Sequence, residues 1–193
     1  MMTAPAARAR SQCASSPSLR VTCTDCVFLP PIDAGLATFT VHQWPDLAAG
    51  LGELRRVTRG PVVVLTADPG ALATFWLVDY APELMEAEAG RMPPVDLIGD
   101  RLGGRVEVEP VPLPADCTDG FVEAFFGRPE SLLDDRVRRC QSAWGFVDAA
   151  VEARSVAALR VALADGSWDR RHGHLRTLAE YPGSIRLIRA TPG

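Results

Sequence analysis

Two short apolar runs in the first third of the chain flank a segment with helical periodicity. The runs are Leu36–Val41 and Val62–Leu65, and both are rich in residues that favour β-strands. Between them, apolar residues recur every three or four positions, at Leu47, Leu51, Leu54 and Val57. The pattern predicts a strand, a helix and a second strand, with the helix beginning at Pro45 or Asp46 and stopping at Gly60.

The two predicted strands are apolar on both faces, whereas the helix between them has one apolar stripe. This combination predicts an α/β fold in which the strands are parallel and helices cover the sheet. In such sheets, ligands bind beyond the carboxyl ends of the strands. We therefore expect the functional site near Thr40–Trp44 and Thr66–Asp68.

The remainder of the chain alternates helical and extended patterns. Helical patterns cover residues 71–80, 94–102, 118–126, 129–144 and 148–164. In the fourth of these, the residues expected to face inward are Leu133, Val137, Cys140 and Trp144. Extended patterns predict an edge strand at Arg105–Leu113, because prolines interrupt it, and a last strand at Ser184–Ala190. We expect an acidic run of Glu83, Glu86 and Glu88 to be a solvated face.

Composition limits the classes of partner. The chain has 193 residues and a net charge of -4, and its twenty basic residues are all arginines without a basic cluster. This charge predicts neither a nucleic-acid partner nor an anionic membrane surface, and no apolar run approaches the roughly 20 residues of a membrane span. The odd number of cysteines favours a reducing, cytoplasmic location.

Metal-binding patterns are weak. Cys23 and Cys26 have the spacing of a zinc or redox pair, but no second pair follows, so we expect no metal site. Residues 170–174, with three basic residues and a second histidine, could hold a phosphate or a metal, although a solvated turn explains them better. We expect residues 1–18 to form a disordered tail and residues 19–193 to form one domain.

Several short strings occur together in a characteristic order. Asp25–Pro30 reads Asp-Cys-Val-Phe-Leu-Pro, and the next strand ends in Val-His-Gln-Trp at Val41–Trp44. Further strings lie at residues 75–80, 106–112, 116–121 and 168–176. Together they resemble the UbiE-like, type 11 group of class I S-adenosylmethionine-dependent methyltransferases. The resemblance covers about residues 20–190.

The resemblance implies a fold and a function. The fold would be a partial Rossmann-like sheet with helices on both faces and a helical cap at about 115–180. The last strand would pair antiparallel with the strand beginning at Arg105. The cofactor would be S-adenosylmethionine and the acceptor a small molecule.

The resemblance also implies site residues. Asp25 would accept a hydrogen bond from the adenine amino group, and the Cys26 backbone would meet the ring. Thr40, His42 and Trp44 would lie at the mouth of the pocket, with His42 as general base. On the residues alone, Asp25 could equally be a turn aspartate, and His42 a capping or packing residue.

One part of the family pattern is missing. The glycine-rich turn and the acidic residue that follow the family's first two strands should precede Asp25, yet the first glycine is Gly35. We therefore expect a truncated enzyme, or a non-catalytic remnant that acts as an interaction module. The edge of Leu36–Val41 would then be open, to be covered by residues 19–22 or by a second copy in a homodimer.

Overall fold

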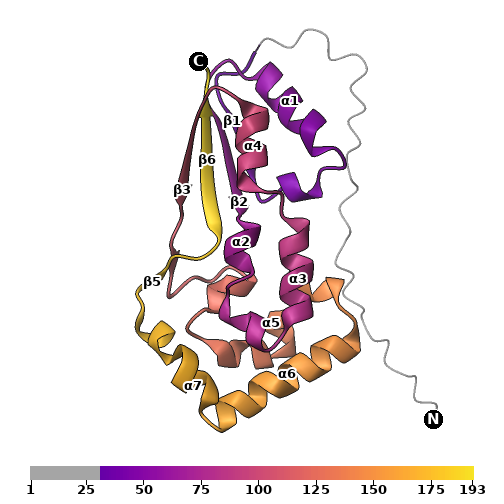
Figure 1. The fold of residues 1–193 in the computed structure, drawn as a ribbon, viewed down its shortest axis with the longest axis vertical. Coiled ribbons are helices and arrows are strands. Elements are labelled where there is room, and N and C mark those ends of the chain that lie inside the picture. Colours follow the sequence, from indigo (N-terminus) through magenta and orange to yellow (C-terminus); the bar gives the residue numbers. More distant parts are fainter. Residues whose placement is uncertain (1–30) are drawn as a thin grey trace, which may run out of the picture.

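A computed structural model describes residues 31–193. A four-stranded sheet with two covering helices forms one end of the molecule, and the remaining helices gather at the other (Figure 1). The expectations for the tail, the short strand at residues 19–22, Asp25 and Cys26 fall outside the described residues.

The predicted strand, helix, strand unit is confirmed. Strand β1 (Gly35–Thr38) leads through the 3-10 helix η1 (Val41–Gln43) into α1 (Leu47–Val57), and β2 (Val62–Ala67) follows. The Asp46 carboxylate caps α1 by accepting a hydrogen bond from the Ala49 amide at 2.9 Å. The helix ends at Val57, three residues before Gly60, and β1 pairs with β2 in parallel.

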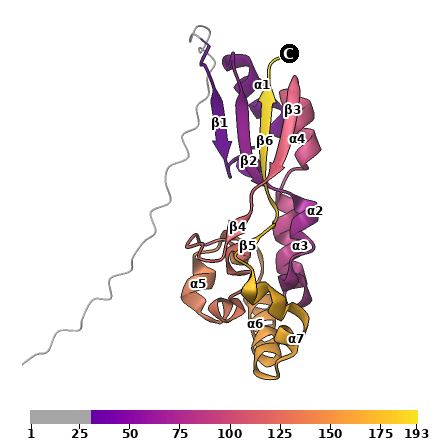
Figure 2. The same ribbon diagram turned by 90° about the vertical axis from the view of Figure 1, so that its left-hand side faces the viewer.

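The sheet has the order β1-β2-β6-β3 (Figure 2). The last strand, β6 (Ile185–Thr191), is antiparallel to both β2 and β3 (Arg105–Pro110). The expected antiparallel pairing of the last strand with the Arg105 strand is therefore confirmed, and the sheet is mixed. Strands β1 and β3 are its two edges among the described residues.

The sheet is covered unequally. Helices α1 and α4 (Val95–Leu102) pack together over one face, where Leu51, Val64, Ile98 and Ile188 are fully buried. On the opposite face, Leu36 of β1 is 71% exposed. Helices on both faces of the sheet were expected. Within residues 31–193, the helices that pack on the sheet lie on one face only.

Helices at the other end surround an aromatic core. They are α2 (Pro69–Leu72), η2 (Trp76–Asp79), α3 (Pro82–Arg91), η3 (Val122–Phe125), η4 (Pro129–Leu133), α5 (Asp135–Arg139), η5 (Ser142–Phe146), α6 (Ala149–Ala164), α7 (Ser167–His172) and η6 (Gly173–Thr177). Phe75, Trp76 and Trp168 are buried there. The Trp76 indole donates a hydrogen bond to the Phe126 carbonyl at 3.0 Å. This bond joins η2 to the end of η3.

A two-stranded ribbon lies where the chain enters and leaves the segment that contains helices η3 to η6. Strand β4 (Leu113–Pro114) pairs antiparallel with β5 (Glu180–Tyr181). The ribbon lies between the sheet and the helices in Figure 2. Residues 115–179 therefore leave and return at one place.

Two helical predictions were wrong in detail. The pattern over 129–144 breaks into η4, α5 and η5, and Leu132 is buried while Cys140 is exposed. The Asp134 side chain accepts from the Arg136 amide and starts a new helix within the predicted one. In the segment 118–126, only Val122–Phe125 is helical.

Candidate functional site

A cavity of about 270 Å³ lies at the carboxyl ends of β1 and β2, where the sheet meets the helical end. Phe39 follows β1, and Ala67 ends β2. The wall opposite is contributed by α3, η3 and the start of η5. The position agrees with the prediction from strand order, since both expected loops are represented in the lining.

The backbone at Phe39 directs the chain toward this cavity. Its φ is 47°, in the left-handed region that non-glycine residues rarely adopt. The Phe39 amide still donates to the Leu65 carbonyl at 2.9 Å, so the residue is anchored to β2 as it turns. The turn leads into η1, which places His42 and Gln43 on the cavity wall. Conformations of this kind cost about 1–3 kcal/mol and cluster at functional sites.

His42 is the candidate proton acceptor of the cavity wall. Its Nδ1 is buried without a hydrogen-bond partner among the described residues, and its Nε2 lies 3.4 Å from Gln43 Nε2. Burial lowers the pKa of His42, and the positive charge of Arg91 lowers it further. The neutral imidazole is therefore favoured near pH 7, as a general base requires.

The other predicted site residues lie in different places. Thr40 is exposed, and its carbonyl accepts from the Gln43 amide at 2.9 Å. Trp44 packs against α1, so closely that a Cβ on Gly50 would lie 2.4 Å from Trp44 Cε3. Neither side chain lines the cavity, which therefore contains only His42 of the described site residues.

Three carboxyl groups line the same cavity, from Glu88, Asp119 and Glu123. Glu88 forms an ion pair with Arg91 at 2.7 Å, and the guanidinium of Arg91 also lies 3.8 Å from the centre of the Phe146 ring. The solvated face expected for Glu88 is wrong: its side chain is 14% exposed, because α3 turns Glu88 toward the cavity.

Glu123 is the buried member of this group. It is 2% exposed, and both of its carboxylate oxygens accept from the Ser184 amide, at 3.1 and 3.2 Å. The Ser184 hydroxyl donates to Oε2 as well. Burial raises the pKa of Glu123, while the bonds from Ser184 and the charge of Arg186 act in the opposite direction.

Sequence reasoning missed the residues that complete this site. Phe39, Glu88, Glu123 and Ser184 come from four separate elements or turns, so no local spacing connects them. One signal was present: Glu123 interrupts the apolar run of residues 121–126, and a charged residue in such a run is either exposed or specifically bonded.

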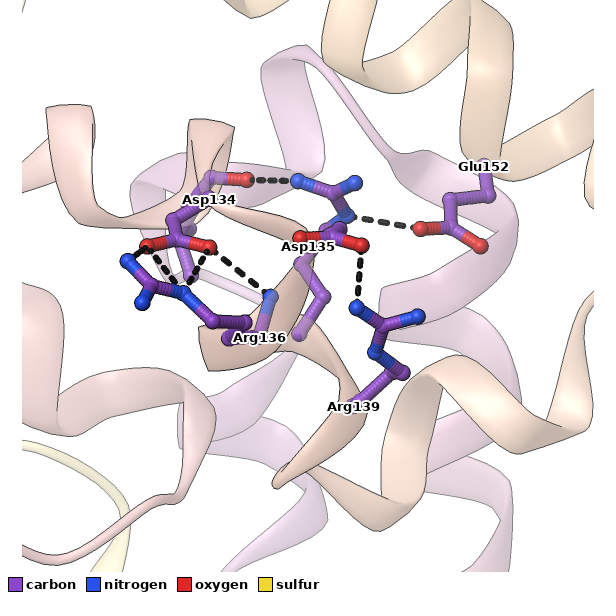
Figure 3. A network of polar contacts seen from close by, with 7 residues as sticks. Asp134, Asp135, Arg136, Arg139 and Glu152 are labelled. Atoms are coloured by element: carbon purple, nitrogen blue, oxygen red, sulfur yellow. Dashed lines mark hydrogen bonds and ion pairs between the residues drawn. The ribbon is translucent and has the colours of Figure 1, made fainter. Parts of the chain in front are cut away.

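A polar network supports the far side of the cavity wall. At the start of α5, Asp134 binds Arg136; within the helix Asp135 binds Arg139, and Glu152 approaches from α6 (Figure 3). Arg138, which is 8% exposed, donates to Glu152 at 2.6 Å and to the Leu132 carbonyl at 2.7 Å. The bonds to Arg136 lower the pKa of Asp134 to about 2. The network fixes α5 just before Ser142, which lines the cavity.

Residues 31–193 contain no group of three or more His, Cys, Asp or Glu residues placed to hold a metal ion. Across the same residues, no helix combines the length and the apolar character needed to cross a lipid bilayer.

A comparison with solved structures gives a methyltransferase-like relative. No known family profile matches the chain, and no curated protein does. A protein of Anabaena variabilis described as a "putative methyltransferase from antibiotic biosynthesis pathway" matches with a TM-score of 0.75 and 30% sequence identity. The match covers 85% of this chain and 69% of the Anabaena chain. The fold, its mixed sheet and the extent of this match show that the chain belongs to the methyltransferase family that the Anabaena protein represents.

Proposed function

We propose that the chain acts in S-adenosylmethionine-dependent methyl transfer to a small-molecule acceptor, within the UbiE-like group that its sequence strings resemble. The observation that carries the proposal is the cavity at the carboxyl ends of β1 and β2, with His42 in its wall. Family membership supports the reaction type. The cavity size supports a small acceptor.

The described residues fit only part of the cofactor. Typical ligand pockets measure about 300–1,000 Å³, and a cavity of about 270 Å³ suits an acceptor and a reacting methyl group better than a whole nucleoside. By the resemblance, Asp25 and Cys26 would hold the adenine. S-adenosylmethionine supplies an activated methyl group when bound.

The chain's own residues would position the acceptor and take up its proton. Phe39 and Phe121 exclude water on the side of the cavity that they line, with ring centres 6.5 Å apart. His42, neutral because its pKa is lowered, would accept the proton that an acceptor hydroxyl or amine releases. Most of the rate enhancement would come from holding the reactants in line.

A calorimetric titration with S-adenosylhomocysteine tests cofactor binding. We expect micromolar binding by the full chain, loss of binding in Asp25→Ala, and no change in Asp100→Ala, which removes an exposed carboxylate from α4. Absence of binding at millimolar ligand would reject the proposal for this polypeptide.

A second candidate function is that of a non-catalytic interaction module. The observation that favours it is the open β1 edge, where Leu36 is 71% exposed and the strand pairs on one side only among the described residues. Such edges recruit further strands. The candidate occupant is a second copy, which would give a homodimer through residues 36–41.

Sedimentation over a range of concentrations tests this assembly. We expect a dimer that Leu36→Arg converts to a monomer. Leu97→Arg, which changes an exposed leucine on α4, should leave the dimer intact. A chain that is monomeric at all concentrations would rule out the homodimer.

A further inference from the structure

The charges around the cavity are unbalanced. Its lining contains three carboxyl groups, and among the described residues neither arginine nor lysine contributes to it. Glu88 is neutralised by Arg91, but Asp119 and Glu123 have no ion-pair partner within residues 31–193. Asp119 is exposed to water, whereas Glu123 is not. Glu123 is therefore the buried carboxyl that a ligand would meet.

The surroundings of Glu123 hold it in one orientation. Ser184 directly precedes β6, and its carbonyl accepts from the Asp68 amide at 2.8 Å, next to the end of β2. The two donors of Ser184 therefore lie at the end of the sheet where the central strand β6 begins. A Cβ on Gly183 would lie 2.9 Å from Glu123 Oε1, so the absence of a side chain there leaves room for the carboxylate.

The carboxylate has unused capacity to accept hydrogen bonds. A carboxylate offers about four lone-pair positions, and Ser184 supplies two donors, of which the amide is shared between both oxygens. Oε1 receives only that shared bond. A buried acceptor of this kind is stabilised when a ligand donates a hydrogen bond to it from an N–H or O–H group.

We propose that Glu123 is the specificity-determining residue of the cavity, and that the molecule bound there is small, largely apolar, and presents an amine or a hydroxyl rather than a carboxylate. The inference deepens the proposed methyl transfer and rests on it, because it takes the molecule bound in the cavity to be the methyl acceptor. The apolar part of the ligand would contact Phe39, Leu72, Met92, Phe121 and Ile185. A carboxylate would face Glu123 and Asp119 without a lining cation to offset the repulsion.

Three probes of one shape test this preference: phenethylamine, phenethyl alcohol and hydrocinnamate, which carry an amine, a hydroxyl and a carboxylate on the same aromatic body. Their binding to the full chain is measured at neutral pH by ligand-observed NMR titration. We expect the amine and the alcohol to bind at least about tenfold more tightly than the carboxylate. Equal or tighter binding of hydrocinnamate would overturn the proposal.

Variants identify the responsible group. Glu123→Gln keeps the size of the side chain and its capacity to accept from Ser184, and it should reduce the advantage of the amine and the alcohol over hydrocinnamate. Glu86→Gln makes the same charge change on the exposed face of α3 and should leave the ranking unaltered. An unchanged ranking in Glu123→Gln, or an equal loss in both variants, would overturn the assignment.

A measurement on the unmodified chain covers the case in which Glu123→Gln does not fold. Because the Ser184 amide donates to Glu123, the chemical shift of this amide should change as phenethylamine is added and should reach a plateau when the binding site is saturated. An unperturbed Ser184 amide at saturating amine would refute the placement.

The probe experiments contain no cofactor, so their outcome is independent of S-adenosylhomocysteine binding. Failure of the calorimetric titration alone rejects methyl transfer by this chain and leaves the ligand preference standing. Failure of the probe ranking alone rejects the role of Glu123 and leaves methyl transfer standing.

Discussion

Two glycines of α1 should respond in opposite ways to the same substitution. Glycine inside a helix costs about 0.5–1 kcal/mol relative to alanine, so helix propensity alone predicts that Gly50→Ala and Gly52→Ala both stabilise the protein. Their surroundings differ. A Cβ at Gly52 meets nothing within 4 Å, whereas one at Gly50 would lie 2.4 Å from Trp44 Cε3 and 2.9 Å from Cζ3.

The Trp44 ring would have to move to admit the methyl group. Overpacking of this kind costs about 1–3 kcal/mol, which exceeds the gain in propensity. We expect Gly50→Ala to lower the free energy of unfolding by about 1 kcal/mol and Gly52→Ala to raise it by about 0.5–1 kcal/mol.

Urea denaturation followed by circular dichroism measures both changes, because the unfolding free energy falls linearly with denaturant. A double-mutant cycle isolates the cause: with Trp44→Ala, Gly50→Ala should become stabilising. Equal stabilisation by both alanines in the original chain would show that Trp44 moves freely. In that case Trp44 would be available at the pocket mouth, and the packing role described above would be wrong.

Three further predictions concern pH, capping and the aromatic core. Because Glu123 has its pKa raised above the ordinary 4.5, it retains its proton longer in the folded chain; its stabilising contribution is complete below that value and is lost as pH rises through the folded value. Glu123→Gln should flatten this decline in a series of thermal unfolding curves, and an identical pH dependence would contradict it. Asp46→Ala, which deletes the cap on the Ala49 amide, should cost about 1 kcal/mol in urea denaturation, and no loss would mean that the cap contributes nothing. Trp76→Phe leaves the Phe126 carbonyl without its donor and should lower the free energy of unfolding by at least about 1 kcal/mol, measured by calorimetry. An unchanged stability would refute the role of that bond.

Several parts of the fold were predictable because their signals are local. The spacing of Leu47, Leu51, Leu54 and Val57 specified α1, and Asp46 marked its start as the structure confirms. The breakdown of the pattern over residues 129–144 was not predictable from apolar spacing. There the Asp134 side chain competes with a continuous helix by accepting from the Arg136 amide, and Arg138 donates to the Leu132 carbonyl.

The candidate site was predictable in position but only partly in composition. Strand order placed it beyond β1 and β2, and His42 does line the cavity. Trp44 was expected beside His42. However, η1 is a single short helical turn that ends before Trp44, and the Trp44 side chain packs against α1. A change of direction within a few residues cannot be read from side-chain types alone.

The sequence by itself determined the β1-α1-β2 unit, the apolar stripes, the closing strand and the family strings, since each depends on residues close together in the chain. Only the tertiary structure decided that Glu88 and Glu123 face one cavity and that Ser184 holds Glu123 at the end of the sheet. These residues lie far apart in sequence, and Glu123 and Ser184 meet because the β4–β5 ribbon holds the two ends of residues 115–179 together. Contacts between distant segments depend on how whole elements pack, which local periodicity does not encode.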